Sequence, residues 1–137
     1  MNNNSLPTVV ITGASGFIGR NFIETFKENF NIVAIARRSQ QEVGIPRHKN
    51  IRWFLADVAD RESVHEIIHE IKEEGGAEYF IHLAAFFDFA NEPNDEYERT
   101  NIIGSQIIFE EAACLGLKRF IFASSLVVSE IPPKGER

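Results

Sequence analysis

Apolar and polar positions fall into alternating blocks along this chain. Five short apolar runs, rich in Val, Ile and Phe, occupy residues 8–12, 31–36, 51–56, 79–85 and 119–128. Runs of this length that lack strict polar alternation are typical of strands covered on both faces of a parallel sheet. The pattern therefore predicts five buried strands.

Between these runs, apolar residues recur at helical spacing. Residues 17–29 carry Phe and Ile at helix-compatible positions, and residues 95–115 form a longer amphipathic segment. A third helix is predicted after Asp60, a suitable N-cap, and is stopped by Gly75 and its neighbour Gly76. Its apolar stripe follows the i, i+3, i+4, i+7 pattern and consists of Val64, Ile67, Ile68 and Ile71.

Strands that alternate with helices favour an α/β fold. Right-handed crossovers then give a doubly wound parallel sheet, with the five strands expected in the order 3-2-1-4-5. We predict one domain over residues 8–137 and a disordered polar lead-in over residues 1–7.

Composition, charge and the length of the apolar runs exclude several kinds of partner for this protein. The 137 residues are 44% hydrophobic and 25% charged, as in ordinary globular domains, and 14 basic against 20 acidic residues give a net charge of −6. Because no basic stripe is present, we predict no nucleic-acid partner. No apolar run approaches about 20 residues, which predicts no membrane partner. The lone Cys114 and the absence of a signal-peptide pattern predict a cytoplasmic location.

A glycine-rich turn follows the first predicted strand. Gly13, Gly16 and Gly19 stand at three-residue spacing just before a predicted helix. Gly13 suits a tight turn, Gly16 leaves room for a diphosphate against the backbone, and Gly19 allows close packing of the helix. The helix start offers N–H groups to an anion. A turn without any ligand is the alternative interpretation.

The glycine motif TGASGFIG resembles that of the extended short-chain dehydrogenase/reductase family, which is also called the NAD-dependent epimerase/dehydratase family. In that family the motif belongs to the N-terminal Rossmann part of the protein. Four further segments resemble the family in the same order: Asp57-Val58, His82 to Ala85, Thr100-Asn101 with Gly104, and Phe120 to Ser125. The resemblance implies a dinucleotide site formed by Gly13, Ser15, Gly16, Phe17, Ile18, Gly19, Asp57, Val58, Leu83, Ala84, Ala85 and Asn101. It also implies that Ser125 is a catalytic serine, with Ser124 more suited to satisfying backbone groups.

The end of the second predicted strand bears on the choice of cofactor. An acidic residue about 20 positions beyond the glycines would bind the ribose 2′-hydroxyl of NAD. Here Arg37 and Arg38 follow Ala36 instead. Because guanidinium groups suit a 2′-phosphate, we predict NADP, with NAD as the alternative cofactor. An ordinary solvated arginine pair is the other interpretation.

The family's proton-transfer pair, Tyr-x-x-x-Lys, has no match. Tyr79 is followed four residues on by Leu83, and Tyr97 by Asn101. We therefore expect the cofactor-binding part of a longer, C-terminally truncated protein, inactive alone. By resemblance its parent is an oxidoreductase, epimerase or dehydratase that transfers hydride at a carbinol or carbonyl carbon of a small-molecule substrate. A non-catalytic dinucleotide sensor or scaffold is the alternative.

Three further features carry predictions. The last strand, without a sixth beside it, would leave an apolar edge, which predicts self-association, for example as a homodimer. His65, Glu66 and His69 match a zinc-hydrolase pattern, but they lie off the apolar stripe, so we predict a solvated face and no metal. Phe86, Phe87 and Phe89 follow the fourth strand and either line a substrate pocket or pack in the core.

Overall fold

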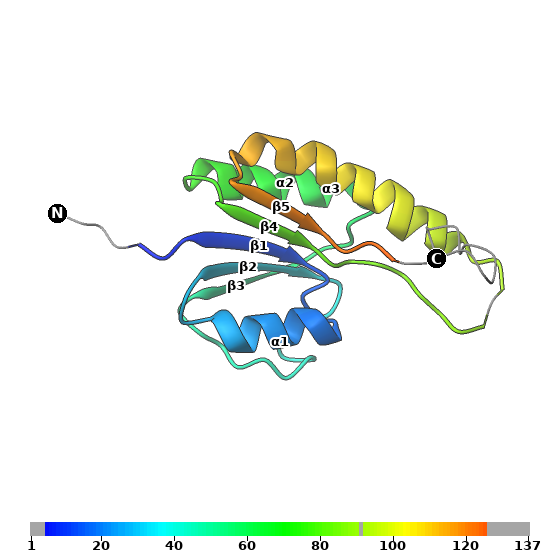
Figure 1. The fold of residues 1–137 in the computed structure, drawn as a ribbon, viewed down its shortest axis with the longest axis horizontal. Helices are drawn as coiled ribbons and strands as arrows, with labels where there is room; N and C mark the ends of the chain where they lie inside the picture. Colours follow the sequence, from blue (N-terminus) through cyan, green and yellow to red (C-terminus); the bar gives the residue numbers. More distant parts are fainter. Residues whose placement is uncertain (1–4, 91, 126–137) are drawn as a thin grey trace, which may run out of the picture.

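The computed structural model describes residues 5–90 and 92–125 and contains one parallel sheet. The strands lie in the order β3-β2-β1-β4-β5 (Figure 1). They are β1 (Thr8–Thr12), β2 (Asn31–Ala36), β3 (Ile51–Leu55), β4 (Tyr79–His82) and β5 (Arg119–Phe122). The predicted fold class and strand order are confirmed.

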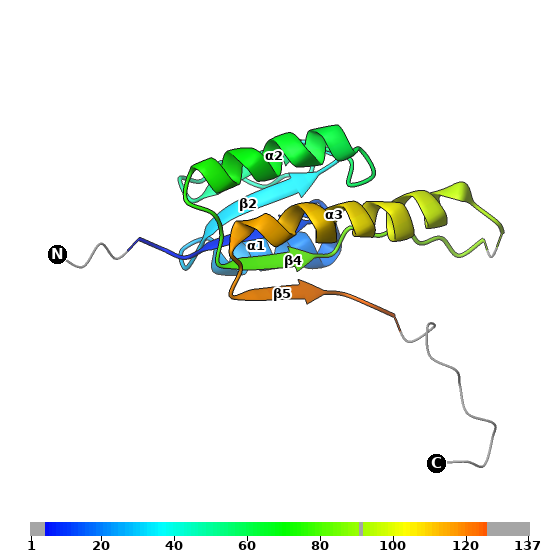
Figure 2. The ribbon, with the colours of Figure 1, turned by 90° about the horizontal axis from the view of Figure 1, so that it is seen from above.

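Helices cover both faces of the sheet. α1 (Phe17–Phe26) lies on one face, and α2 (Arg61–Glu73) and α3 (Ser105–Ala112) lie on the other (Figures 1 and 2). The side chain of Asp60 caps α2 by accepting the N–H of Ser63, as its position in the sequence predicts. Among the described residues, no helix combines the length and apolarity needed to cross a bilayer.

The last predicted helix changes its winding along its length. It begins with π-helical η1 (Tyr97–Gly104), continues as α3 and ends in the 3₁₀ turn η2 (Ala113–Leu115). Gly116 follows with φ 70°, a left-handed conformation that stops the helix. The extent of the helical segment is close to the prediction, whereas its π-helical first half was not foreseen.

β4 and β5 are shorter than the apolar runs suggest. β4 ends at His82, and just beyond it the N–H groups of Leu83 and Ala84 donate to the Thr12 hydroxyl. β5 ends at Phe122, the residue that pairs with His82. The predicted extension of β5 over residues 126–128 lies outside the described residues. Of the predicted lead-in, residues 1–4 also lie outside them, and the carbonyl groups of Leu6 and Pro7 accept hydrogen bonds from Asn31.

Two apolar clusters hold the helices to the sheet. Alternate residues of β1 point to opposite faces, so that Val10 packs toward α2 and α3 while Val9 and Ile11 pack toward α1. The apolar stripe predicted for α2 is fully buried in the first cluster. The β2–β3 connection also contributes to the core, because Ile45 is buried in the cluster with α1.

A buried polar network joins β1, β4 and α3. The ring of His82 is wholly buried, with Nδ1 2.5 Å from Thr12 Oγ1 and Nε2 3.0 Å from Ser105 Oγ. Since Thr12 Oγ1 already accepts the N–H groups of Leu83 and Ala84, its own proton goes to Nδ1. The ring proton is then on Nε2 and is donated to Ser105.

This network predicts acid sensitivity of the fold. Burial lowers the pKa of His82 from 6.5 to about 4, so the unfolded chain binds a proton more readily than the folded chain. The contribution of His82 to the free energy of unfolding is therefore fully present above pH 6.5 and is lost as the pH falls toward 4. Between pH 7 and pH 5 we expect a loss of about 2 kcal/mol in the free energy of unfolding from this group.

Urea denaturation at both pH values measures the effect, with His69→Gln as a matched control on the exposed face of α2. His69→Gln should keep the loss, and His82→Gln should remove most of it. An NMR titration of the wild-type ring that gives an ordinary pKa for His82 would contradict the prediction even if His82→Gln does not fold.

The β5 edge exposes apolar side chains. Ile121 is 46% and Phe122 is 47% exposed, and within the described residues β5 pairs with β4 alone. We expect the 137-residue chain to associate as its concentration rises. Sedimentation velocity should show this association, and Ile121→Lys should shift the protein toward monomer while Glu66→Lys on α2 leaves it unchanged. A monomer at every concentration contradicts the expectation.

Candidate functional site

A cavity of about 450 Å³ lies at the carboxyl ends of β1 to β4. This is the edge of an open α/β sheet at which ligands bind. Its walls include ten of the residues predicted to bind the cofactor: Gly13, Ser15, Gly16, Arg37, Arg38, Asp57, Val58, Leu83, Ala84 and Ala85. The remaining wall residues are Ile35, Ala36, Ala56 and Thr100.

The turn after β1 needs a residue without a side chain. Gly13 has φ +68°, and a Cβ there would lie 2.7 Å from both the backbone nitrogen of Ala84 and the carbonyl carbon of Leu83. Both atoms belong to the rigid exit of β4, so neither could move away cheaply. Gly13 therefore lets the turn touch the neighbouring strand directly.

The start of α1 adjoins the cavity and has no side-chain cap. Its N-cap is Gly16, which lines the cavity, so the first N–H groups of the helix are not satisfied by a capping side chain. Gly19 was expected to bring α1 close to the sheet. Its contact is with the turn itself, since a Cβ on Gly19 would lie 2.5 Å from the Gly13 carbonyl oxygen.

Four of the predicted cofactor-binding residues are not part of the cavity walls: Phe17, Ile18, Gly19 and Asn101. Phe17 is 77% and Ile18 is 63% exposed on the first turn of α1. Because their side chains point to solvent, these two positions have only backbone N–H groups to offer a ligand at the helix start. Their predicted role stays a prediction.

Asn101 fixes the loop after β4. Its Oδ1 accepts the N–H of Phe86 at 2.7 Å, and its Nδ2 donates to the Phe86 carbonyl at 2.9 Å. The Tyr97 ring packs edge-on against Phe86 at 5.0 Å. Asn101 thus holds the chain that leaves the cavity wall at Ala85.

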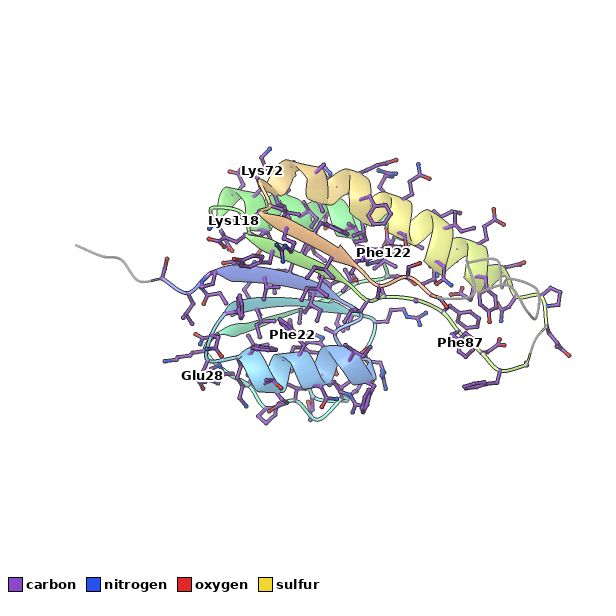
Figure 3. All side chains as sticks on the ribbon, in the orientation of Figure 1. Phe22, Glu28, Lys72, Phe87, Lys118 and Phe122 are labelled. Atoms are coloured by element: carbon purple, nitrogen blue, oxygen red, sulfur yellow. The ribbon has the colours of Figure 1, made fainter. Side chains whose placement is uncertain are left out.

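Two aromatic residues of this loop are not core residues. Phe87 and Phe89 are 68% and 93% exposed, and their rings meet edge-to-face at 5.0 Å. Phe87 lies beyond the carboxyl ends of the strands (Figure 3). The prediction that these two residues pack in the core is therefore wrong, and their role in a substrate pocket stays a prediction.

Ser125, the predicted catalytic serine, is exposed beyond the end of β5.

The two arginines after β2 are both in the cavity wall. Arg38 donates from Nη2 to the Ser15 carbonyl at 2.8 Å, which ties the end of β2 to the glycine-rich turn. The Trp53 indole N–H donates to the Arg38 carbonyl at 2.9 Å and fixes that backbone. Arg37 has a 59% exposed side chain with its Nη1 3.9 Å from Glu96 Oε2.

Asp57 is the acidic group of the cavity wall. Burial by itself would raise the pKa of Asp57, but the Ala59 N–H at 2.9 Å and the Arg99 guanidinium at 3.0 Å together lower it below its ordinary value. Asp57 is thus ionised at neutral pH. No sequence pattern pointed to Arg99, because its partner Asp57 is 42 positions away and the two meet only in the fold.

The zinc-hydrolase pattern is on the outer face of α2. His65 Nδ1 lies 2.8 Å from Glu111 Oε2, and the rings of His65 and His69 stack at 6.2 Å. Among residues 5–90 and 92–125, no three His, Cys, Asp or Glu side chains are grouped so that they could hold a metal ion. These histidines contribute no wall to the cavity.

Comparison with known proteins settles the family. A model of the NAD-dependent epimerase/dehydratase family matches residues 9–137. The chain belongs to the NAD-dependent epimerase/dehydratase family. The resemblance predicted from the glycines and the four later segments is therefore confirmed.

Similar proteins of this epimerase/dehydratase type differ in what they act on. Sterol demethylase protein B of Methylococcus capsulatus is 26% identical over 93% of this chain and 37% of its own length. The structure of UDP-glucose 4-epimerase from Thermotoga maritima, solved with UDP-glucose, is 29% identical, with a TM-score of 0.70 over 86% of this chain and 38% of that one.

A third similar protein supports the fold alone. The structure of ElxO with NADP bound is 22% identical, with a TM-score of 0.75 over 93% of this chain and 59% of that one. The present chain spans 35–40% of the length of the curated relatives it matches.

The contact at Gly19 yields a test of the turn. Gly19→Ala would press a methyl group onto the backbone of Gly13 and Ala14, at 2.5 and 2.8 Å. Such overpacking should lower the free energy of unfolding by about 1–3 kcal/mol. Urea denaturation measures it, with Arg20→Ala on the exposed side of α1 as the control. A Gly19→Ala protein as stable as the wild type would show that the turn yields easily.

Proposed function

We propose that this chain binds NADP and forms the cofactor-binding part of an oxidoreductase, epimerase or dehydratase. Membership in the family and the cavity at the carboxyl ends of the strands support dinucleotide binding. The single observation that carries the choice of NADP is the pair Arg37 and Arg38 in the cavity wall, at the end of β2, where an NAD-binding protein has an acidic residue.

The cavity fits the parts of a dinucleotide. The uncapped start of α1, beside Gly13 and Gly16, offers N–H groups and the positive end of a helix to the diphosphate. Arg38 is already oriented by its bond to Ser15, so its guanidinium loses little freedom on binding a 2′-phosphate. Asp57 and Val58 line the side proposed for the adenine.

When bound, the nicotinamide ring would give or accept a hydride at a carbinol or carbonyl carbon of the substrate. The residues of this chain position the reactants for that step. Leu83, Ala84 and Ala85 form the wall beyond the diphosphate, and the buried Thr12–His82–Ser105 network underlies them and keeps them rigid. We assign to Ser125 the orientation of the substrate oxygen.

The substrate is proposed to be a small molecule that carries such a carbinol or carbonyl group. Phe87 and Phe89 are positioned to meet its apolar part, since both are exposed on the loop that Asn101 holds. The similar proteins include one named for sterols and one solved with a nucleotide sugar, so the family alone leaves this choice open.

Calorimetric titration with NADPH and NADH tests the cofactor. We expect NADPH to bind the wild-type chain at least tenfold more tightly than NADH. Arg37→Gln and Arg38→Gln should each weaken NADPH binding by roughly tenfold and leave NADH nearly unchanged, because only NADPH carries the 2′-phosphate. Arg47→Gln removes the same charge from the exposed β2–β3 connection and should change neither. Equal affinities, or tighter NADH binding, contradict NADP preference.

A further inference from the structure

A carboxylate near the cavity lies close to Arg37, one of the two arginines predicted to bind the 2′-phosphate. Glu96 directly precedes η1, and its Oε2 lies 3.9 Å from Arg37 Nη1. The same oxygen accepts the hydroxyl of Thr100 at 3.0 Å, and Thr100 is itself a wall residue. Glu96 is therefore held in place by its own helical segment while it contacts the end of β2.

Glu96 belongs to a chain of alternating charges. Its other oxygen, Oε1, lies 3.4 Å from Arg99 Nη1, and Arg99 Nη2 lies 3.0 Å from Asp57 Oδ2. The four side chains join the ends of β2 and β3 to the start of η1. Asp57 and Arg37 line the cavity, so this charged chain runs along its edge.

We infer that Glu96 sets the cofactor preference of this site by competing with the 2′-phosphate for Arg37. The inference rests on the proposed binding of NADP. Arg37 has Glu96 as its ion-pair partner among the described residues, with the charged groups 3.9 Å apart, so a phosphate that binds Arg37 competes with that carboxylate. Arg99 has a second carboxylate partner, Asp57, so loss of Glu96 frees Arg37 without leaving Arg99 unpaired.

The exposures of the two side chains limit the size of the effect. Arg37 is 59% and Glu96 is 32% exposed, and exposed pairs of this kind are weak. A phosphate with nearly two negative charges therefore displaces Glu96 from Arg37. The competition nevertheless lowers the affinity of the site for that phosphate. Removal of the charge also takes a repulsive carboxylate away from the phosphate. Together these effects should tighten NADPH binding by roughly three- to tenfold.

The test compares Glu96→Gln with Glu98→Gln, which removes an equal charge from an exposed residue of the same helical segment. Calorimetry at low salt should give NADPH binding that is roughly three- to tenfold tighter in Glu96→Gln and unchanged in Glu98→Gln. NADH, which lacks the phosphate, should bind both variants like the wild type. Tightening of both cofactors by Glu96→Gln, or of neither, overturns the inference.

A double-substitution cycle shows whether the effect acts through Arg37. In an Arg37→Gln background only the repulsive part of the effect remains, so Glu96→Gln should change the affinity for NADPH by a clearly smaller factor than in the wild type. An undiminished effect in that background means that Glu96 acts by general repulsion, and competition for Arg37 is then wrong. If the wild-type chain binds neither dinucleotide, the proposed function itself fails, whereas normal binding with an inert Glu96→Gln rejects this inference alone.

Discussion

The backbone contact between the first turn and the exit of β4 is the constraint on which the rest of the site depends. At Gly13 the chain leaves β1 in a left-handed conformation and touches Leu83 and Ala84 where a Cβ would not fit. That contact leaves the start of α1 beside the cavity, and the absence of a side-chain cap leaves N–H groups available there. One small residue thereby sets both the shape of the cavity and its attraction for an anion.

The buried network beneath this contact explains its rigidity. The Thr12 hydroxyl accepts the N–H groups of Leu83 and Ala84, which follow β4, so it holds the backbone that forms the cavity wall. His82 completes the network in its neutral form, because burial disfavours the charged ring. The architecture thus depends on a polar cluster at a position where the sequence shows only an apolar run with one histidine.

Charge, in contrast, governs the outer edge of the cavity. Arg37 and Arg38 follow β2, Asp57 follows β3, and Glu96 and Arg99 come from the helical segment around η1. Since these groups are partly exposed, each ion pair between them is weak. A charged group of a ligand can therefore replace one partner of such a pair. Such an edge suits discrimination between similar ligands better than it suits stabilisation of the fold.

Sequence patterns were enough to predict the sheet, its strand order, the cap of α2 and most of the cavity wall. These features depend on local patterns, such as continuous apolar runs, Asp60 before a helix, and glycines between a strand and a helix. The family resemblance added Asp57, Val58 and the segment from Leu83 to Ala85, since each stands at a fixed place in an ordered series of motifs.

The contacts between side chains of different elements, in contrast, became visible in the folded chain and not in the sequence. The pairing of Arg99 with Asp57, of Glu96 with Arg37 and of His82 with Thr12 joins residues 42, 59 and 70 positions apart. Tertiary packing also placed Phe87 and Phe89 in solvent and Ile45 in the core. Periodicity reports the environment of a residue within its own element, whereas such contacts depend on how separate elements come together.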